Sequence, residues 1–395
     1  MNILIIYYNW DFGNNRGTKR TIEDHLYSFK RYEKTCNYFY LNLDMFDPNT
    51  LTDEICHMYF DSVIFHYSFL TLRFKRAYQG FYMTIREKLK SLSGVKVLLP
   101  HDEYIYTSDL WMLINDLDIK RVYTCLPDDI AVIYPEKEIG KTSDLFRPVL
   151  TGYIDEGLLE QVNHQLEERK KIRIIDVGYR ALKADYRFGY FGEQKSILHD
   201  EFHKVASEFP LLNHDVKLTY SAIVNNEPVV KNALIGDEWF GFLLDCRTSL
   251  GTLSGSSLLD AYGNIHNEVQ AYMKEHNNIA TYEEIEKNCY QGRDGSVKSE
   301  VYGPRHFEYA MAKTCPVFLE GDYGTELEAG KHYIEIKRNY SNMRDVIKQV
   351  LDIEQCEKIA LEYRNSMLNC EKYSYRTFAK YIIEDIRSLV DLQSM

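Results

Sequence analysis

The sequence predicts an α/β protein with two doubly wound, Rossmann-like domains. Residues 2–8 form a continuous apolar, β-rich run, and a glycine-containing loop and a helix follow them. The same order of elements begins again at the apolar run 172–177. Strand, loop and helix in this order are typical of a parallel sheet that binds ligands at the carboxyl ends of its strands. A chain of 395 residues is long enough to form two such cores.

The predicted domain boundaries lie where this pattern stops and restarts. Residues 1–155 form the first domain, and the charged segment 156–171 is predicted as a linker helix. Residues 172–368 form the second domain, in which the polar stretch 260–298 is predicted as a helical insertion. Residues 369–395 are predicted to end the chain in a helix.

The individual elements follow from the hydrophobic pattern. Predicted strands of the first domain are 2–8, 36–43, 62–66, 95–99, 121–126 and 130–134. Those of the second domain are 172–177, 216–223, 317–319 and 333–337. Predicted helices include 72–92, 194–209, 236–246, 305–313, 343–353, 356–368 and 375–392. The segment from Arg247 to Ser257 is rich in glycine and hydroxyl groups, and we interpret it either as a phosphate cradle or as a polar loop.

Composition and charge exclude some classes of protein. The chain is 45% hydrophobic and 27% charged, which is ordinary for a globular protein. Its net charge is −12. A general nucleic-acid binder is more often basic, so a nucleic-acid partner is disfavoured.

The cysteines and the apolar runs predict a cytoplasmic protein. The eight cysteines are scattered and form no C-x-x-C pair, which favours reduced thiols. The N-terminal run lacks a basic flank and a cleavage site, and no run of about 18 apolar residues occurs. The segment 72–92 is basic and amphipathic, and it is interpreted either as a solvated helix or as a face for an acceptor or the inner membrane surface.

Residues 300–308 read Glu-Val-Tyr-Gly-Pro-Arg-His-Phe-Glu and carry two carboxylates separated by seven residues. Pro304 suits the first turn of a helix, and Gly303 lets backbone N–H groups face a ligand. A helix N-terminus favours anions. The first carboxylate is therefore predicted in the loop before the helix, and the second about one turn inside it. Two surface glutamates beside an ordinary helix are the alternative.

This stretch resembles the E-x7-E signature of retaining glycosyltransferases with the GT-B fold, of the family-4 type (glycosyltransferases group 1). Its segment Pro-Arg-His-Phe-Glu is similar to the corresponding segment in a bacterial subgroup of these enzymes. The resemblance implies two Rossmann-like domains facing a central cleft, with the final helix returning to the first domain. It also implies that Glu300 contacts the donor hexose and Glu308 the ribose hydroxyls. In the family a proline usually follows the second glutamate by seven residues, whereas here Pro316 stands one position later.

The resemblance implies further contacts for the donor diphosphate. Family members open their second domain with Gly-Arg and a later lysine, and here Gly178 is followed by Arg180 and by either Lys183 or Lys195. The planar fork of arginine binds phosphate oxygens bidentately. Arg305 is a further candidate for the phosphates.

Three more places are candidates for the site. His101 follows the strand 95–99, and the resemblance implies that it lines the cleft between donor and acceptor. The loop that contains Gly13 is implied to approach the donor phosphates and the acceptor. Tyr323 and Gly324 belong to a glycine loop after the strand 317–319, where backbone N–H groups could meet phosphate or sugar hydroxyls.

The predicted function is transfer of a hexose-type sugar from a UDP- or GDP-linked donor to a glycan, lipid-linked or protein acceptor. The resemblance implies retention of the anomeric configuration. No Asp-x-Asp metal motif stands out, so metal-independent chemistry is predicted, with no cofactor beyond the donor. One alternative is a sugar-nucleotide epimerase of the same fold. The other is a tyrosine-rich glycan-binding or assembly protein without activity.

Overall fold

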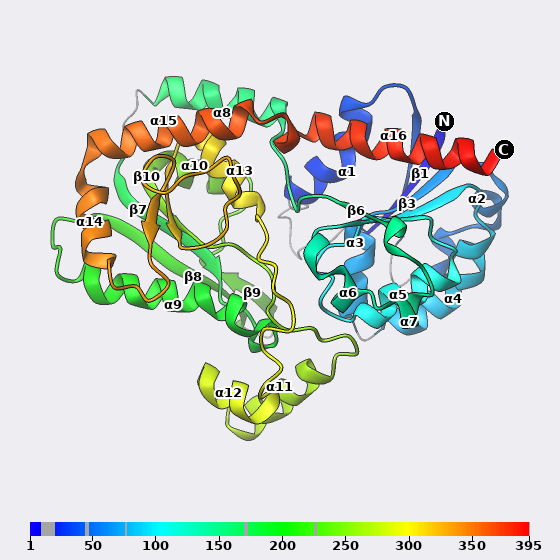
Figure 1. Ribbon diagram of the computed structural model, residues 1–395, viewed down its shortest axis with the longest axis horizontal. Coiled ribbons are helices and arrows are strands. Elements are labelled where there is room, and N and C mark those ends of the chain that lie inside the picture. The colour runs from blue at the N-terminus through cyan, green and yellow to red at the C-terminus, as the bar shows by residue number, and fades with distance from the viewer. Residues whose placement is uncertain (9–19, 44–46, 76, 170–172, 225–226, 395) are drawn as a thin grey trace. The chain divides into compact units, whose positions relative to one another are not determined.

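The chain forms two compact α/β units in the computed structural model, which describes residues 1–8, 20–43, 47–75, 77–169, 173–224 and 227–394 (Figure 1). The first unit contains residues 1–151, 257–299 and 375–395. The second unit contains residues 152–256 and 300–374. Each unit is built on a largely parallel six-stranded sheet, which confirms the predicted fold class of two Rossmann-like domains.

The sheet of the first unit has the strand order β2-β1-β3-β4-β5-β6, and all its neighbouring strands are parallel. The strands are β1 (Asn2–Tyr7), β2 (Asn37–Asn42), β3 (Ser62–Phe65), β4 (Val95–Leu98), β5 (Arg121–Thr124) and β6 (Phe146–Pro148). The apolar side chains of β1 and β3 are buried. Because β2 and β3 lie on opposite sides of β1, the chain order reverses there, which defines a topological switch point.

The sheet of the first unit is covered by short helices and one long one. They are α1 (Arg20–Tyr32), α2 (Asp53–His57), α3 (Tyr67–Leu70), α4 (Tyr78–Ser91), α5 (Thr107–Asp116), α6 (Ile130–Ile133), α7 (Glu136–Ile139) and α16 (Tyr375–Ser394). Helix α16 packs against α1. It is also tied to the sheet, because Arg121 Nε donates to Asp385 Oδ2 over 2.7 Å.

The predicted insertion forms the helices α11 (Asn264–Glu275) and α12 (Tyr282–Cys289). It packs with the first unit, although in the sequence it interrupts the second. Both of its ends are hydrogen-bonded to first-unit loops. Tyr106 N donates to Asp260 O over 2.8 Å, and Ser299 N donates to Asp129 Oδ2 over 2.8 Å.

The sheet of the second unit has the order β12-β11-β10-β7-β8-β9. Its strands are β7 (Ile175–Leu182), β8 (His214–Val224), β9 (Glu227–Lys231), β10 (Cys246–Gly251), β11 (Cys315–Leu319) and β12 (Ile334–Ile336). Only the pairing of β8 with β9 is antiparallel among these described strands. The switch point lies between β7 and β10.

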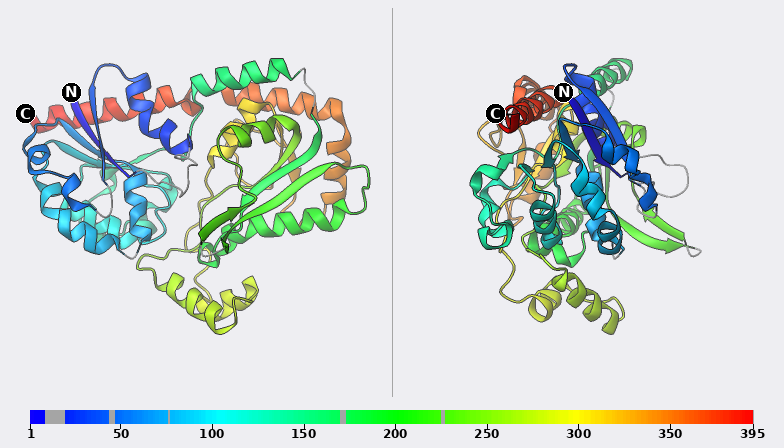
Figure 2. Two further views of the ribbon diagram at one scale, coloured as in Figure 1. Left: turned by 180° about the vertical axis from the view of Figure 1, so that it is seen from behind. Right: turned by 90° about the vertical axis from the view of Figure 1, so that its right-hand side faces the viewer.

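Helices cover both faces of this second sheet (Figure 2). They are α8 (Glu156–Glu168), α9 (Gly189–Ala206), α10 (Asp237–Asp245), α13 (Pro304–Ala312), α14 (Met343–Leu351) and α15 (Ile353–Asn369). A continuous apolar core joins β7, β10 and β11 to α9, α14 and α15. On the face toward α10, a Cβ on Gly178 would come within 2.3 Å of Cys246 Sγ, so only glycine allows this close packing.

Several predicted elements differ from the structure. Residues 130–134, predicted as a strand, form α6. Residues 246–251, which we placed at the end of a helix and in a polar loop, form the central strand β10. Their hydroxyl groups are satisfied by the neighbouring strand, since Thr248 Oγ1 donates to Asp176 O over 2.7 Å and Ser249 Oγ to Gly178 O over 3.0 Å. The strand β6 and the antiparallel strand β9 were not predicted.

The basic segment 72–92 is not one helix. It divides into a 3-10 turn at Thr71–Phe74 and the helix α4. Arg73 is buried and donates to the backbone oxygens of His101 and Asp102 over 2.9 and 2.7 Å. On α4, Arg86 pairs with Asp116 over 2.7 Å. These two cations therefore help to hold the fold of the first unit together.

Candidate functional site

The candidate site lies at the carboxyl edge of the second sheet, at its switch point. The loops that follow β10 and β7 meet there. Ser256 Oγ in the first loop donates to Phe188 O in the second over 3.1 Å. Ser254 and Val301 exchange two backbone hydrogen bonds of 2.9 and 2.8 Å. This pairing fixes the segment 300–303 at the edge of the sheet where doubly wound folds bind ligands.

Helix α13 starts directly after this segment. Pro304 occupies its first turn, and its N-cap residue Gly303 makes no side-chain capping bond. The first N–H groups of the helix are therefore not satisfied by a capping side chain, and the positive end of the helix dipole lies at the site. The helix ends at Lys313, which has a left-handed φ of 51°.

Glu300 is held by an arginine that the sequence analysis did not identify. Arg338 Nη2 lies 2.5 Å from Glu300 Oε2. Arg338 follows β12, and its backbone N–H donates to Glu320 Oε2 over 3.0 Å, just after β11. The ends of two neighbouring strands therefore place this guanidinium beside the first carboxylate of the signature.

Glu308 lies one turn inside α13 and contacts α10. Trp239 Nε1 donates to Glu308 Oε2 over 2.8 Å. The guanidinium of Arg305 lies over the Trp239 ring at 5.4 Å and over the Tyr179 ring at 5.8 Å. One indole therefore links the second carboxylate to the cation that precedes it on the same helix.

His306 lies buried on the same helix, with its ring against those of Tyr302, Phe318 and Tyr323. Its Nδ1 is 3.0 Å from Gly303 O, so this nitrogen carries the proton and donates it to the carbonyl. Its Nε2 is buried without a hydrogen-bond partner in the described part of the protein. Burial lowers the pKa of His306 to about 4, although the bond to Gly303 raises it, and the charges of Arg305 and Lys195 lower it further. His306 is therefore a neutral imidazole at pH 7.

Arg180 is already bound to a carboxylate. It lies on β7 and donates from Nη2 to Asp215 Oδ2 over 2.5 Å and from Nη1 to Asp215 O over 2.8 Å. Its guanidinium also lies 4.4 Å from the centre of the Phe242 ring. Phe242 in turn stacks on Trp239, with ring centres 5.8 Å apart. Arg180 and Glu308 thus lie on the same face of the unit, joined through two aromatic rings.

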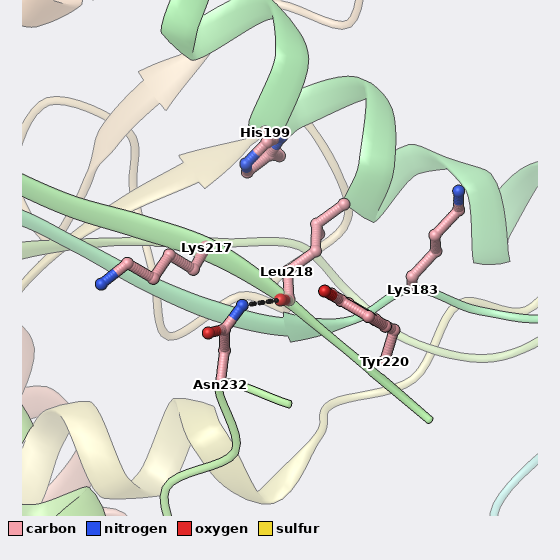
Figure 3. A pocket seen from close by; sticks show the side chains of 6 residues that line it. All are labelled: Lys183, His199, Lys217, Leu218, Tyr220 and Asn232. Atoms are coloured by element: carbon pink, nitrogen blue, oxygen red, sulfur yellow. Dashed lines mark hydrogen bonds between the residues drawn. The ribbon is translucent and has the colours of Figure 1, made fainter. Parts of the chain in front are cut away.

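Lys183 follows β7 and lines a surface pocket of about 560 Å³ (Figure 3). The other residues that line this pocket are His199, Lys217, Leu218, Tyr220 and Asn232. Asn232 Nδ2 donates to Leu218 O over 2.9 Å, which fixes one wall. The lining includes none of the residues 300–308. The charge of Lys195, the other candidate, acts on His306 of α13.

The glycine loop after β11 is internally satisfied. The Tyr323 ring is buried against Phe318, with ring centres 4.7 Å apart, and its hydroxyl donates to Leu319 O over 2.8 Å. Gly324 has a φ of +73°, and its N–H donates to Asp322 Oδ1 over 2.9 Å. Tyr302 donates its hydroxyl hydrogen to the backbone oxygen of Tyr323. This loop supports the signature segment through Tyr302.

His101 belongs to the first unit and follows β4. Its ring stacks on Tyr67, with centres 3.9 Å apart and planes 7° apart. His25 and His66 lie next to this pair and are joined by a hydrogen bond of 2.9 Å between Nδ1 and Nε2. Burial lowers the pKa of all three histidines, that of His101 to about 4. Gly13 lies outside the described residues.

The described residues contain neither a cluster of metal ligands nor a helix that could span a membrane. Within these ranges no group of three or more His, Cys, Asp or Glu side chains is placed to hold a metal ion. In the same part of the chain, every helix is too short or too polar to pass through a bilayer.

Sequence reasoning missed Arg338, His306 and the contact of Trp239. Arg338 stands one residue beyond the last predicted strand, 333–337. A charged residue directly after a strand, at the carboxyl edge of a parallel sheet, is the signal that could have identified it. No comparable signal exists for Trp239, because its contact with Glu308 depends on how α10 packs against α13.

Comparisons with known proteins bear on the fold. No protein-family model matches the sequence, and no curated protein matches it significantly. Among solved structures, the Anabaena protein Alr3699/HepE in complex with UDP and glucose is 11% identical, with a TM-score of 0.50 over 98% of this chain and 100% of that one. An alpha-glucosyltransferase in complex with UDP and a mismatched 13-mer DNA is 8% identical, with a TM-score of 0.53 over 98% and 99%. The chain therefore has the GT-B fold.

Proposed function

We propose that this protein is a glycosyltransferase that uses a nucleotide-sugar donor. It moves a hexose-type sugar to a glycan, lipid-linked or protein acceptor, with retention of configuration and without a metal. The observation that supports this most is the placement of both signature carboxylates at the carboxyl edge of the second sheet, each with a fixed polar partner. The two solved structures of the same fold described above hold UDP, one of them with glucose.

The arrangement suits a leaving diphosphate. Negative charge develops on the departing phosphate during sugar transfer, and fixed cations and N–H groups stabilise it. Arg305 and the uncapped N-terminus of α13 supply both. We assign Lys195 to the same group, because its charge acts on the same helix. Arg180 stays a prediction for the diphosphate, since its guanidinium would have to exchange Asp215 for phosphate oxygens.

The two glutamates are assigned to the two sugars of the donor. Glu308 accepts hydrogen bonds from the ribose hydroxyls, and Trp239 holds its other oxygen. Glu300 contacts the hexose. His101, neutral at pH 7, is assigned to the acceptor side as a hydrogen-bond partner rather than as a cation. Tyr323 and Gly324 are assigned supporting roles, because their described contacts lie within the fold. Lys183 is assigned a supporting role as well, because it lines the pocket of Figure 3.

Calorimetry with UDP and GDP tests the ribose assignment. Glu308→Gln should weaken binding of the preferred nucleotide by roughly 10- to 100-fold, because a hydrogen bond to a charged group contributes about 1.5–3 kcal/mol. Trp239→Phe should weaken it less, since it removes only the group that orients Glu308. Inorganic diphosphate should bind both variants as it binds the wild type. Glu357→Gln, at an exposed position on α15, is the matched control.

The products decide between the proposal and its alternatives. With a bound donor and no acceptor, slow release of free sugar supports the transferase, and an epimerised sugar nucleotide supports the epimerase. A wild-type protein that binds neither UDP nor GDP would contradict the proposal and favour a glycan-binding role. Retention is checked by determining the anomeric configuration of the product.

A further inference from the structure

We propose that Arg338 is a specificity-determining residue, which together with Glu300 recognises an uncharged donor hexose. Arg338 orients the Glu300 carboxylate and offers its own N–H groups to the oxygens of the same sugar. This inference rests on the proposed function and names the class of donor that the site accepts.

The position of Arg338 is fixed by three elements. Its backbone N–H donates to Glu320 Oε2 over 3.0 Å, and Glu320 N donates to Ile336 O over 2.7 Å. These contacts join the ends of β11 and β12. The side chain then reaches Glu300, which is held by the pairing of Val301 with Ser254. The ion pair thus joins the loop before α13 to the end of the sheet.

The exposure of the two partners differs. The Glu300 side chain is 13% exposed and the Arg338 side chain 38% exposed. An ion pair with one such open partner contributes little to stability, typically about 0–1 kcal/mol. A mainly stabilising role therefore does not account for it well. The covered carboxylate needs a partner, whereas the open guanidinium can meet a ligand.

Both members of the Arg338–Glu300 pair keep hydrogen-bonding groups that the pair itself does not use. Arg338 Nη2 contacts Glu300 Oε2, and the structure shows no other hydrogen bond from this guanidinium to a described residue. Glu300 Oε1 likewise accepts no hydrogen bond from the described residues. A carboxylate only accepts and a guanidinium only donates, whereas a hydroxyl does both. Neighbouring hydroxyls of a hexose could therefore donate to Glu300 and accept from Arg338 at the same time.

The charge of the pair sets the class of donor. One positive and one negative group cancel, so the pair is matched to a neutral sugar. The carboxylate of a uronic acid would compete with Glu300 for Arg338 and would lie next to a like charge, which is unfavourable. We therefore expect neutral hexoses to be preferred over uronates.

The test measures donor hydrolysis and nucleotide binding in the full chain. The probes are UDP-glucose and UDP-glucuronate, or GDP-mannose if calorimetry shows that GDP is preferred. Arg338→Ala should lower kcat/KM for the neutral donor by roughly 10- to 100-fold, the loss expected for a charge-assisted hydrogen bond. The Kd for the free nucleotide should stay within about twofold, because Arg338 is not assigned to the nucleotide. Arg338→Lys should restore part of the activity.

The matched control is Arg344→Ala on α14. Arg344 pairs with Glu208 over 2.5 Å, the same separation as in the Arg338 pair, and is exposed. The thermal midpoints of Arg338→Ala and Arg344→Ala should be similar. The double variant Glu300→Gln, Arg338→Ala should lose less activity than the sum of the losses of the two single variants, because each single change already disrupts the same ion pair.

Different results would overturn the inference and the proposed function. If the wild type hydrolyses the donor and Arg338→Ala behaves like Arg344→Ala, the inference is wrong and the proposed function stands. A parallel loss of nucleotide affinity would place Arg338 on the nucleotide and also overturn the inference. Equal use of glucuronate and glucose donors by the wild type contradicts the preference for neutral sugars. If the wild type binds no nucleotide and hydrolyses no donor, the proposed function itself fails.

Discussion

His306 shows how a single residue at the site couples to the stability of the fold. Its pKa of about 4 arises mainly from burial, with the charges of Arg305 and Lys195 acting in the same direction. In the unfolded chain a histidine has a pKa of about 6.5. Between these two values the unfolded state binds a proton that the native state does not bind. Acid therefore favours unfolding.

We expect the contribution of His306 to be fully present above about pH 6.5 and to be lost below it, at about 1.4 kcal/mol per pH unit. His306→Phe should reduce the slope of the unfolding free energy against pH between 6.5 and 4 by the contribution of one bound proton. Urea unfolding at several pH values measures this slope. Glu103 acts in the opposite direction, because burial raises its pKa to about 7. It acts equally in the variant and the wild type.

His276→Phe serves as the control for this experiment, since His276 is an exposed residue that stacks on Tyr272. If His306→Phe keeps the slope of the wild type, the neutral state of His306 does not contribute to the pH dependence of stability.

At the residue scale, the sequence predicted the two carboxylates of the signature but not the groups that hold them. The seven-residue spacing and the Gly-Pro pair placed Glu300 before a helix and Glu308 inside it, and both positions agree with α13. Their partners Arg338 and Trp239 lie 38 and 69 residues away in the sequence. Only the packing of separate strands and helices brings such residues together, so no local pattern reveals them.

At the scale of elements, the errors have a physical cause. Residues 246–251 carry Arg, Thr, Ser and Gly, which indicate a loop when each is judged by its own preference. They form a central strand because the hydroxyls of Thr248 and Ser249 bond to β7, and because Gly178 on β7 leaves room for Cys246. Burial next to a partner strand thus overrides local preference. Long apolar runs such as β1 were predicted correctly.

Helix α16 offers a test at this scale, because Asp385 ties it to the first sheet through ion pairs with Arg121 and Arg147. Asp385 accepts hydrogen bonds from Arg121 Nε and Nη2 over 2.7 and 3.1 Å and from Tyr123 Oη over 2.9 Å. Asp385→Ala would leave the nearly buried Arg121 charge without its partner. We expect a loss of about 3 kcal/mol in the free energy of unfolding, measured with urea.

Glu384→Ala is the control on the same helix. Glu384 pairs with Lys380 over 3.9 Å, and both side chains are exposed. An exposed pair of this kind contributes at most about 0.5 kcal/mol. Equal effects of the two changes would mean that Asp385 does not anchor α16 to the sheet.

At the scale of the whole molecule, the candidate donor contacts fall in one unit. Glu300, Glu308, Arg305 and Arg338 all belong to residues 152–256 and 300–374, whereas His101 belongs to the other unit. The two-domain pattern could be predicted because each sheet begins with an apolar run. The assignment of residues 257–299 to the first unit could not, since it depends on hydrogen bonds to Tyr106, Ser108 and Asp129.

Hydrogen exchange can show whether the nucleotide binds where this division places it. A ligand at about 100 times its Kd stabilises the native state by about 2.7 kcal/mol, and amides that open locally near the site gain most of this protection. We expect UDP or GDP to slow exchange in α10, in α13 and in the segment 252–256, with little change in α4 and α5 of the first unit. A donor analogue that carries the hexose should add protection at 300–303 and 338–340, because the sugar and not the nucleotide contacts Glu300 and Arg338. Protection by the nucleotide that is confined to the first unit would contradict the assignment of Glu308 to the ribose.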